Sequence, residues 1–137
     1  NDTMQWIKST TEEQFLHPKA ILDVDREGRG EFFSLWGLQA YLIYTVLGPE
    51  VLQHWLEEEY NLEVVQNLKT EHHLAIHAPR AWGLYSVYIA TSDEIWKEAY
   101  DMHVQASIDL HPVWKLNRRA YAHWVPQFTL YAILMSL

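Results

Sequence analysis

A long stretch without charged residues runs from Phe32 to Pro49 and reads FFSLWGLQAYLIYTVLGP. A helix that crosses a bilayer needs about 20 mostly apolar residues, and this stretch is shorter and diluted by polar side chains. Its small or weakly polar residues recur at steps of three or four: Ser34, Gly37, Tyr41, Thr45 and Gly48. The pattern predicts a central buried helix over 32–47, with a narrow stripe along which another helix can approach closely.

Helical periodicity continues along the rest of the chain. Apolar residues recur at helical spacing over 51–56 and 64–76, after the break at Gly48-Pro49. Thr91 precedes Glu94 by three positions, which is typical of a helix start. The apolar stripe expected behind this start is Ile95, Ala99, Met102 and Ala106. Residues 116–124 and 126–137 predict two further helices.

We therefore predict an all-α fold, a compact bundle of about six to seven helices around the central apolar helix 32–47. An α+β fold with strands near 84–91, 103–110 and 127–135 stays open as the alternative. Residues 84–91 are rich in β-forming side chains, and the other two segments alternate with period two. The length of 137 residues indicates a single domain over 1–137, with the segment 1–30 at its periphery.

Composition and charge narrow the classes of function. A formal net charge of -8 argues against nucleic-acid binding, which needs a basic patch. The densest acidic run, Glu57, Glu58 and Glu59, is either a solvated helix face or a binding surface for a basic protein partner. The chain has no cysteine, which excludes disulfides and thiolate metal sites. We expect a soluble protein, with membrane contact as the less favoured possibility.

Candidate chemistry is concentrated in the histidines. On a helix, His73 and His77 are four positions apart and present two imidazoles to one face, the spacing at which one helix supplies two metal ligands. With His103 as a third ligand they form a candidate site for a divalent metal or haem. The ligand set is incomplete, so ordinary histidines at the edge of the core are the alternative.

Aromatic residues offer a second candidate site. The chain contains 7 Trp and 8 Tyr, which supply buried area and also recur in binding surfaces. At helical spacing, Trp82, Tyr85 and Tyr88 could line a pocket for an apolar ligand or simply form part of the core. Phosphate-binding glycine loops and the serine-hydrolase elbow are missing from the sequence.

These features favour a non-catalytic protein–protein interaction or assembly module. Its partner is expected to be another protein or a second copy of the chain, because aromatics and acidic residues abound while catalytic motifs are missing. The alternative is a helical protein that binds a metal or small ligand through the histidine cluster, a class that includes enzymes. The sequence leaves open whether the chain is an enzyme at all.

Overall fold

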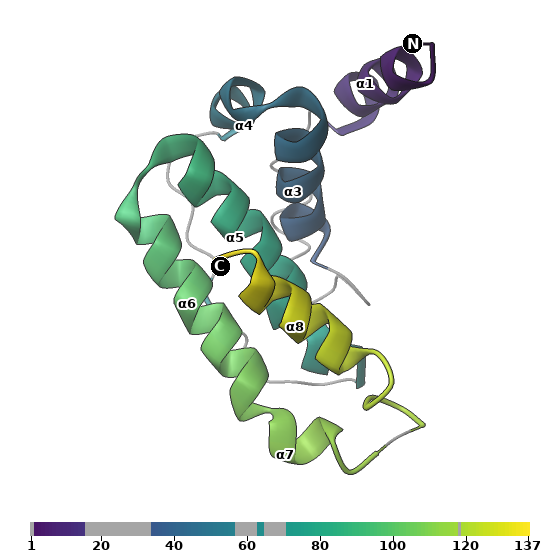
Figure 1. Ribbon diagram of the computed structural model, residues 1–137, viewed down its shortest axis with the longest axis vertical. Coiled ribbons are helices and arrows are strands. Elements are labelled where there is room, and N and C mark those ends of the chain that lie inside the picture. Colours follow the sequence, from purple (N-terminus) through teal and green to yellow (C-terminus); the bar gives the residue numbers. More distant parts are fainter. Residues whose placement is uncertain (1, 16–33, 57–62, 65–70, 118) are drawn as a thin grey trace.

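The computed structural model describes residues 2–15, 34–56, 63–64, 71–117 and 119–137. Every regular element in this part of the chain is helical, so the predicted all-α bundle is confirmed there (Figure 1). The elements are α1 (Asp2–Phe15), α3 (Leu35–Leu47), α4 (Pro49–Trp55), the 3₁₀ helix η1 (Glu71–Ala75), α5 (His77–Thr91), α6 (Glu94–Asp109), α7 (His111–Trp114) and α8 (Val125–Leu134).

The α+β alternative is wrong, because its three expected strands lie in α5, α6 and α8. The helix start expected near 91–94 is present, but the capping residue is Asp93 rather than Thr91. The Asp93 carboxylate accepts a hydrogen bond from the Ile95 amide at 3.1 Å. Thr91 supports this turn by accepting a hydrogen bond from the Asp93 amide at 3.3 Å. The cap commits residues 94–109 to a helix in spite of their alternating apolar pattern.

Helix α5 is the most enclosed element of the bundle. Eleven of its 15 residues are buried, and it packs against α3, α4, α6 and α8. The uncharged helix predicted over 32–47 is a core helix, α3, but it flanks α5 rather than occupying the centre. Its outer side stays in contact with solvent, as shown by Leu35, which is 44% exposed.

Two glycines bring α3 and α5 into backbone contact. A Cβ atom on Gly37 would lie 2.2 Å from the Pro79 carbonyl oxygen, and one on Gly83 would lie 2.6 Å from the Gly37 Cα. No side chain fits at either position without moving a helix. The close approach predicted from the small residues of 32–47 is therefore confirmed, and Gly83 is the partner that the pattern did not identify. Ser34 starts α3 by accepting a hydrogen bond from the Gly37 amide at 2.9 Å.

Helix α6 turns a different face to the core from the one expected. Of the predicted stripe, Ile95 and Met102 are 63% and 55% exposed. The buried residues of α6 are instead Tyr100, His103 and Ser107. His103 meets His77 of α5, so the contact between α5 and α6 is more polar than hydrophobic periodicity suggests. Ser107 instead bonds Thr129 of α8.

Helix α1 lies at the edge of the molecule and packs against α3 (Figure 1). The prediction of a peripheral segment over 1–30 stays a prediction, because residue 1 and residues 16–30 lie outside the described residues. Among the helices that the structure describes, none has the length and apolar character needed to cross a membrane.

Candidate functional site

A group of ionisable side chains lies in the interior where α5 and α6 meet. We call it the interior basic cluster, and its members are His77, Arg80 and His103. None is more than 1% exposed to solvent, and His103 is fully buried. His77 and Arg80 form the first turn of α5, and His103 comes from the buried face of α6. The fold thus gathers residues that are as many as 26 positions apart in the sequence.

The structure brings two of the three predicted metal ligands together. The ring centroids of His77 and His103 are 6.1 Å apart, and the ring planes are inclined by 56°. His73 lies on the adjoining η1 and is also buried. In the described ranges, however, no group of three or more His, Cys, Asp or Glu side chains is placed so that it could hold a metal ion.

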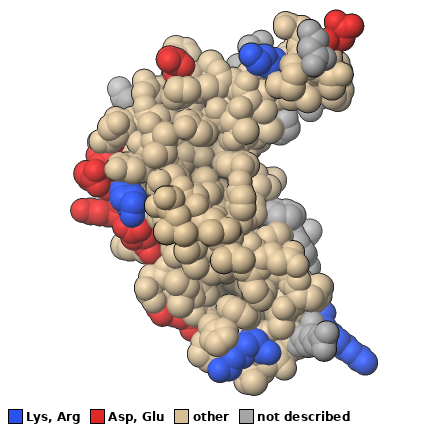
Figure 2. Space-filling view, viewed as in Figure 1, with Lys and Arg blue, Asp and Glu red and all other residues tan. Residues whose placement is uncertain are grey.

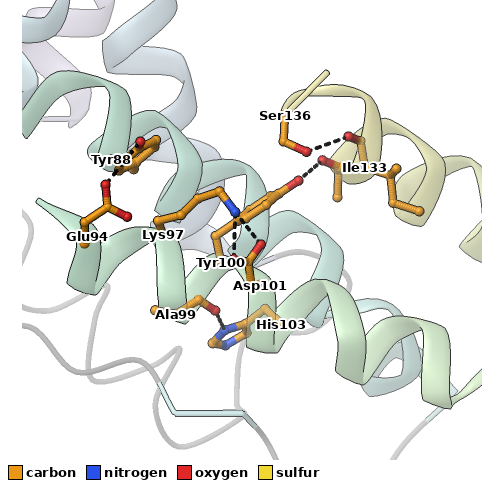
Figure 3. Close-up of polar contacts among 10 residues, drawn as sticks. Tyr88, Glu94, Lys97, Ala99, Tyr100, Asp101, His103, Ile133 and Ser136 are labelled. Carbon is orange, nitrogen blue, oxygen red and sulfur yellow. Dashed lines mark hydrogen bonds and ion pairs between the residues drawn. The ribbon is translucent and has the colours of Figure 1, made fainter. Parts of the chain in front are cut away.

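His103 has a defined protonation state. Its Nδ1 lies 2.8 Å from the Ala99 carbonyl oxygen (Figure 3), and because a carbonyl only accepts, Nδ1 carries the hydrogen. Burial lowers the pKa of His103 to about 4, the nearby charge of Arg80 adds to this, and the carbonyls of Ala99 and Glu63 oppose it. The ring is therefore neutral at pH 7. Its Nε2 keeps a lone pair, is buried and makes no hydrogen bond of ordinary geometry to a described atom.

Arg80 supplies a fixed positive charge at this site, and sequence reasoning missed it. The guanidinium is only 1% exposed, and its Nη1 donates a hydrogen bond to the Glu63 carbonyl at 2.8 Å. A usable signal was present, because Arg80 is the one Asp, Glu, Lys or Arg residue between Glu71 and Asp93. A lone charge in an apolar helix costs much free energy to bury and is therefore worth noticing. The site combines this cation with a neutral imidazole acceptor.

The three aromatic residues of the proposed ligand pocket face different neighbours. Trp82 packs against Phe128 and Tyr131 of α8, with ring centroids 5.4 and 5.3 Å away. Tyr85 instead contacts Tyr100 of α6 at 4.9 Å. The hydroxyl of Tyr88 reaches the Glu94 carboxylate at 3.4 Å (Figure 3). These contacts make the three residues part of two separate packing regions.

The boundary between α6 and α8 is held by a buried phenol. The Tyr100 hydroxyl donates to the Ala132 carbonyl at 2.6 Å (Figure 3), and burial raises the pKa of Tyr100. On the outer side, Lys97 pairs with Asp101 at 2.6 Å and its ammonium lies 5.0 Å from the Tyr100 ring centroid. These groups close the bundle at the C-terminal end of α8 and serve packing.

The outward face of α8 is mostly apolar. Its exposed apolar members are Leu130, Tyr131 and Leu134, at 56%, 41% and 53% of full exposure, and we call them the α8 stripe. Their spacing places them on one side of the helix, opposite the buried Val125, Thr129 and Ala132. Gln127 is the exposed polar residue of the same face. Helix α8 contains no charged residue, so both of its faces are uncharged.

Charged side chains gather elsewhere on the surface. Exposed carboxylates follow α6, and Lys and Arg side chains lie at the end of the molecule where α7 is found (Figure 2). The middle of the face seen in Figure 2, where Figure 1 shows α8, is nearly free of charge. The predicted partner-binding run Glu57, Glu58 and Glu59 lies outside the described residues.

Comparison with protein-family models, with curated proteins and with solved structures finds no match for this chain. The residues themselves therefore have to indicate the function. Two places stand out from an ordinary helical bundle, namely the interior basic cluster and the α8 stripe. Only the α8 stripe is open to a large partner, because the members of the cluster are buried.

Proposed function

We propose that the protein is a non-catalytic interaction module that pairs with a second copy of itself through the α8 stripe. The observation that carries this proposal is an exposed apolar stripe on a helix with no charged residue. A helix on the surface of a soluble bundle usually turns charged or polar side chains to water. A contiguous exposed apolar patch is typical of an interaction site.

The neighbouring helix α3 supports a broader contact surface. It also has no charged residue, and its hydroxyl-bearing Tyr41 is hydrogen-bonded to Tyr131 of the stripe. The two rings pack edge to face with centroids 6.1 Å apart. The ring of Trp82 also packs against Tyr131, with centroids 5.3 Å apart. Tyr131 is thus held in place before any partner arrives. A pre-ordered aromatic side chain loses little conformational entropy on binding, which suits it to the centre of an interface.

Charge distribution is compatible with a second copy as the partner. Two chains of net charge -8 repel each other unless their carboxylates stay apart. Contact through the α8 stripe satisfies this condition, because the exposed carboxylates of α6 lie away from it (Figure 2). Antiparallel pairing of α8 about a twofold axis is self-complementary and brings Leu130 of one protomer near the partner's Leu134.

The test is the oligomeric state of a double variant, Leu130→Lys with Leu134→Lys, measured by sedimentation velocity and light scattering over a range of concentrations. We expect a dimer for the native chain and a monomer for the variant, because two lysines face each other in an apolar contact. The expected loss of association free energy is more than about 2 kcal/mol. Circular dichroism should show unchanged helix content, since both positions are exposed.

A matched control comes from α6, whose Ile95 and Met102 are 63% and 55% exposed. The double variant Ile95→Lys with Met102→Lys adds the same charge at equally exposed apolar positions and should leave the dimer intact. A native chain that stays monomeric at every concentration would refute self-pairing. Equal dissociation of both double variants would show that charge alone, rather than the α8 stripe, controls association.

A further inference from the structure

The C-terminal part of the chain differs in charge from the rest. All 18 Asp and Glu residues lie at or before Asp109, whereas three of the ten Lys and Arg residues follow it: Lys115, Arg118 and Arg119. Strong asymmetry of charge along a chain indicates a segment with a partner of its own. In the fold Lys115 and Arg119 follow α7, at one end of the molecule (Figures 1 and 2).

Apolar side chains project at the same end. Leu116 is 82% exposed and Val113 is 51% exposed, and the exposed Lys115 lies between them in the sequence, with the exposed Arg119 four residues after Lys115. We call the described residues 111–117 and 119 the basic tip. Within it, strongly exposed aliphatic side chains and exposed cations follow one another without an intervening carboxylate.

The basic tip is attached to the bundle in a defined way. Trp114 is half-buried, and its indole Nε1 donates a hydrogen bond to the Ser107 carbonyl of α6 at 3.3 Å. Its ring meets that of His111 edge to face, with centroids 4.6 Å apart. Ser107 is in turn fixed by Thr129 of α8, with 2.7 Å between the hydroxyl oxygens. Trp114 therefore anchors the turn, so that Val113 and Leu116 are presented outward.

We propose that the basic tip docks the protein on an anionic lipid surface. The interfacial layer of a membrane accepts both kinds of side chain at once, because aliphatic groups enter the acyl boundary while Lys and Arg meet the headgroups. A nucleic-acid backbone would pair with the cations but would leave Leu116 in water. The acidic remainder of the chain is repelled by the same lipid surface, which orients the molecule with the tip toward it.

This attachment is peripheral and moderate in strength. Each Lys or Arg near an anionic surface contributes roughly a fivefold factor to binding, and a buried leucine contributes about tenfold or more. Salt weakens the cationic part, since the screening length is about 10 Å at 0.1 M ionic strength. The proposal does not depend on self-pairing, because the tip and the α8 stripe are different surfaces.

The test is vesicle flotation of the full chain with phosphatidylcholine vesicles, with and without phosphatidylserine. We expect the protein to float only with the vesicles that contain phosphatidylserine, and we expect a smaller fraction to float at high salt. The variant Lys115→Glu with Arg119→Glu should bind about twentyfold or more weakly, and Leu116→Ser about tenfold more weakly. Matched controls are Lys8→Glu and Ile95→Ser, an exposed cation and an exposed aliphatic far from the tip, and both should float like the native chain.

Three outcomes would overturn the proposal. One is a native chain that fails to float with phosphatidylserine vesicles, and another is a loss in the control variants equal to that in the tip variants. The third is binding to single-stranded DNA that charge reversal removes but Leu116→Ser leaves unchanged, with no vesicle binding, which would assign the tip to a nucleic acid. The variant Leu130→Lys with Leu134→Lys should still float, so failure of self-pairing is distinguishable from failure of lipid binding.

Discussion

Helix α5 packs against α3 on one side and α6 on another, and the two contacts are built in opposite ways. Toward α3, Gly37 and Gly83 let the backbones touch without any intervening side chain. Toward α6, His77 and Arg80 meet His103 in a buried group of ionisable residues. The contact with α3 requires that the two glycines have no side chain. The contact with α6 depends on whether the buried histidines are protonated.

The two contacts should therefore respond to different changes. A close-packed backbone contact is sensitive to volume, because protein interiors have little free space to absorb an added group. A buried polar contact is sensitive to charge, because a new charge in the interior loses its hydration. The contact of α5 with α3 thus depends on side-chain volume, and its contact with α6 depends on the protonation state of buried side chains.

The largest effect is expected from Gly37→Ala. Its Cβ would meet the backbone of Pro79, so no rotamer change can relieve the overlap and the helices must separate. We expect the free energy of unfolding to fall by about 3 kcal/mol or more, measured by urea denaturation. An alanine in place of a glycine normally stabilises a helix interior by about 1 kcal/mol. A loss of stability would therefore support the close backbone contact, and a gain would contradict it. Thr45→Ala, at an exposed position of α3, is the control and should change stability little.

The second prediction concerns acid. The folded pKa of His103 is about 4, below its ordinary value of 6.5, so the unfolded chain takes up the proton first as pH falls. The stability that depends on a neutral His103 is therefore complete above pH 6.5 and is lost progressively as the pH falls to about 4. The expected contribution of His103 is at most about 3 kcal/mol. The measurement is the free energy of unfolding against pH for the native chain and for His103→Asn.

Asparagine is a suitable replacement because its amide can donate to the Ala99 carbonyl as Nδ1 does, yet it does not titrate. The difference in stability between the two proteins should shrink steadily between pH 6.5 and 4. Parallel curves over that range would contradict a neutral, buried His103.

The smallest of the three effects is expected from Tyr100→Phe, on the same buried face of α6. It removes the hydroxyl that donates to the Ala132 carbonyl at 2.6 Å and leaves that buried carbonyl without this donor. We expect a loss of about 1 to 2 kcal/mol in thermal or urea unfolding. Because Tyr100 is neutral at ordinary pH, the loss should be the same at pH 5 and pH 7. A loss that changes with pH would show that the Tyr100 hydrogen bond is coupled to a group that titrates between pH 5 and 7.

Much of the local structure follows from the sequence alone. Periodicity and capping residues identify the helices of residues 35–47 and 94–109, and the small residue Gly37 marks where another helix can approach. These are properties of a single segment, since they depend on the helical repeat and on side-chain size. Lack of cysteine likewise excludes thiolate chemistry without any structure.

Only the tertiary structure decided which face of each helix is covered. Ile95 and Met102 form a regular apolar stripe but face solvent, whereas the polar His103 is buried against α5. Trp82 and Tyr85 are one turn apart on α5 but pack against α8 and α6, respectively. The physical reason is that periodicity tells which residues share a face, while burial depends on the neighbouring helices, and these are brought together only when the whole chain has folded.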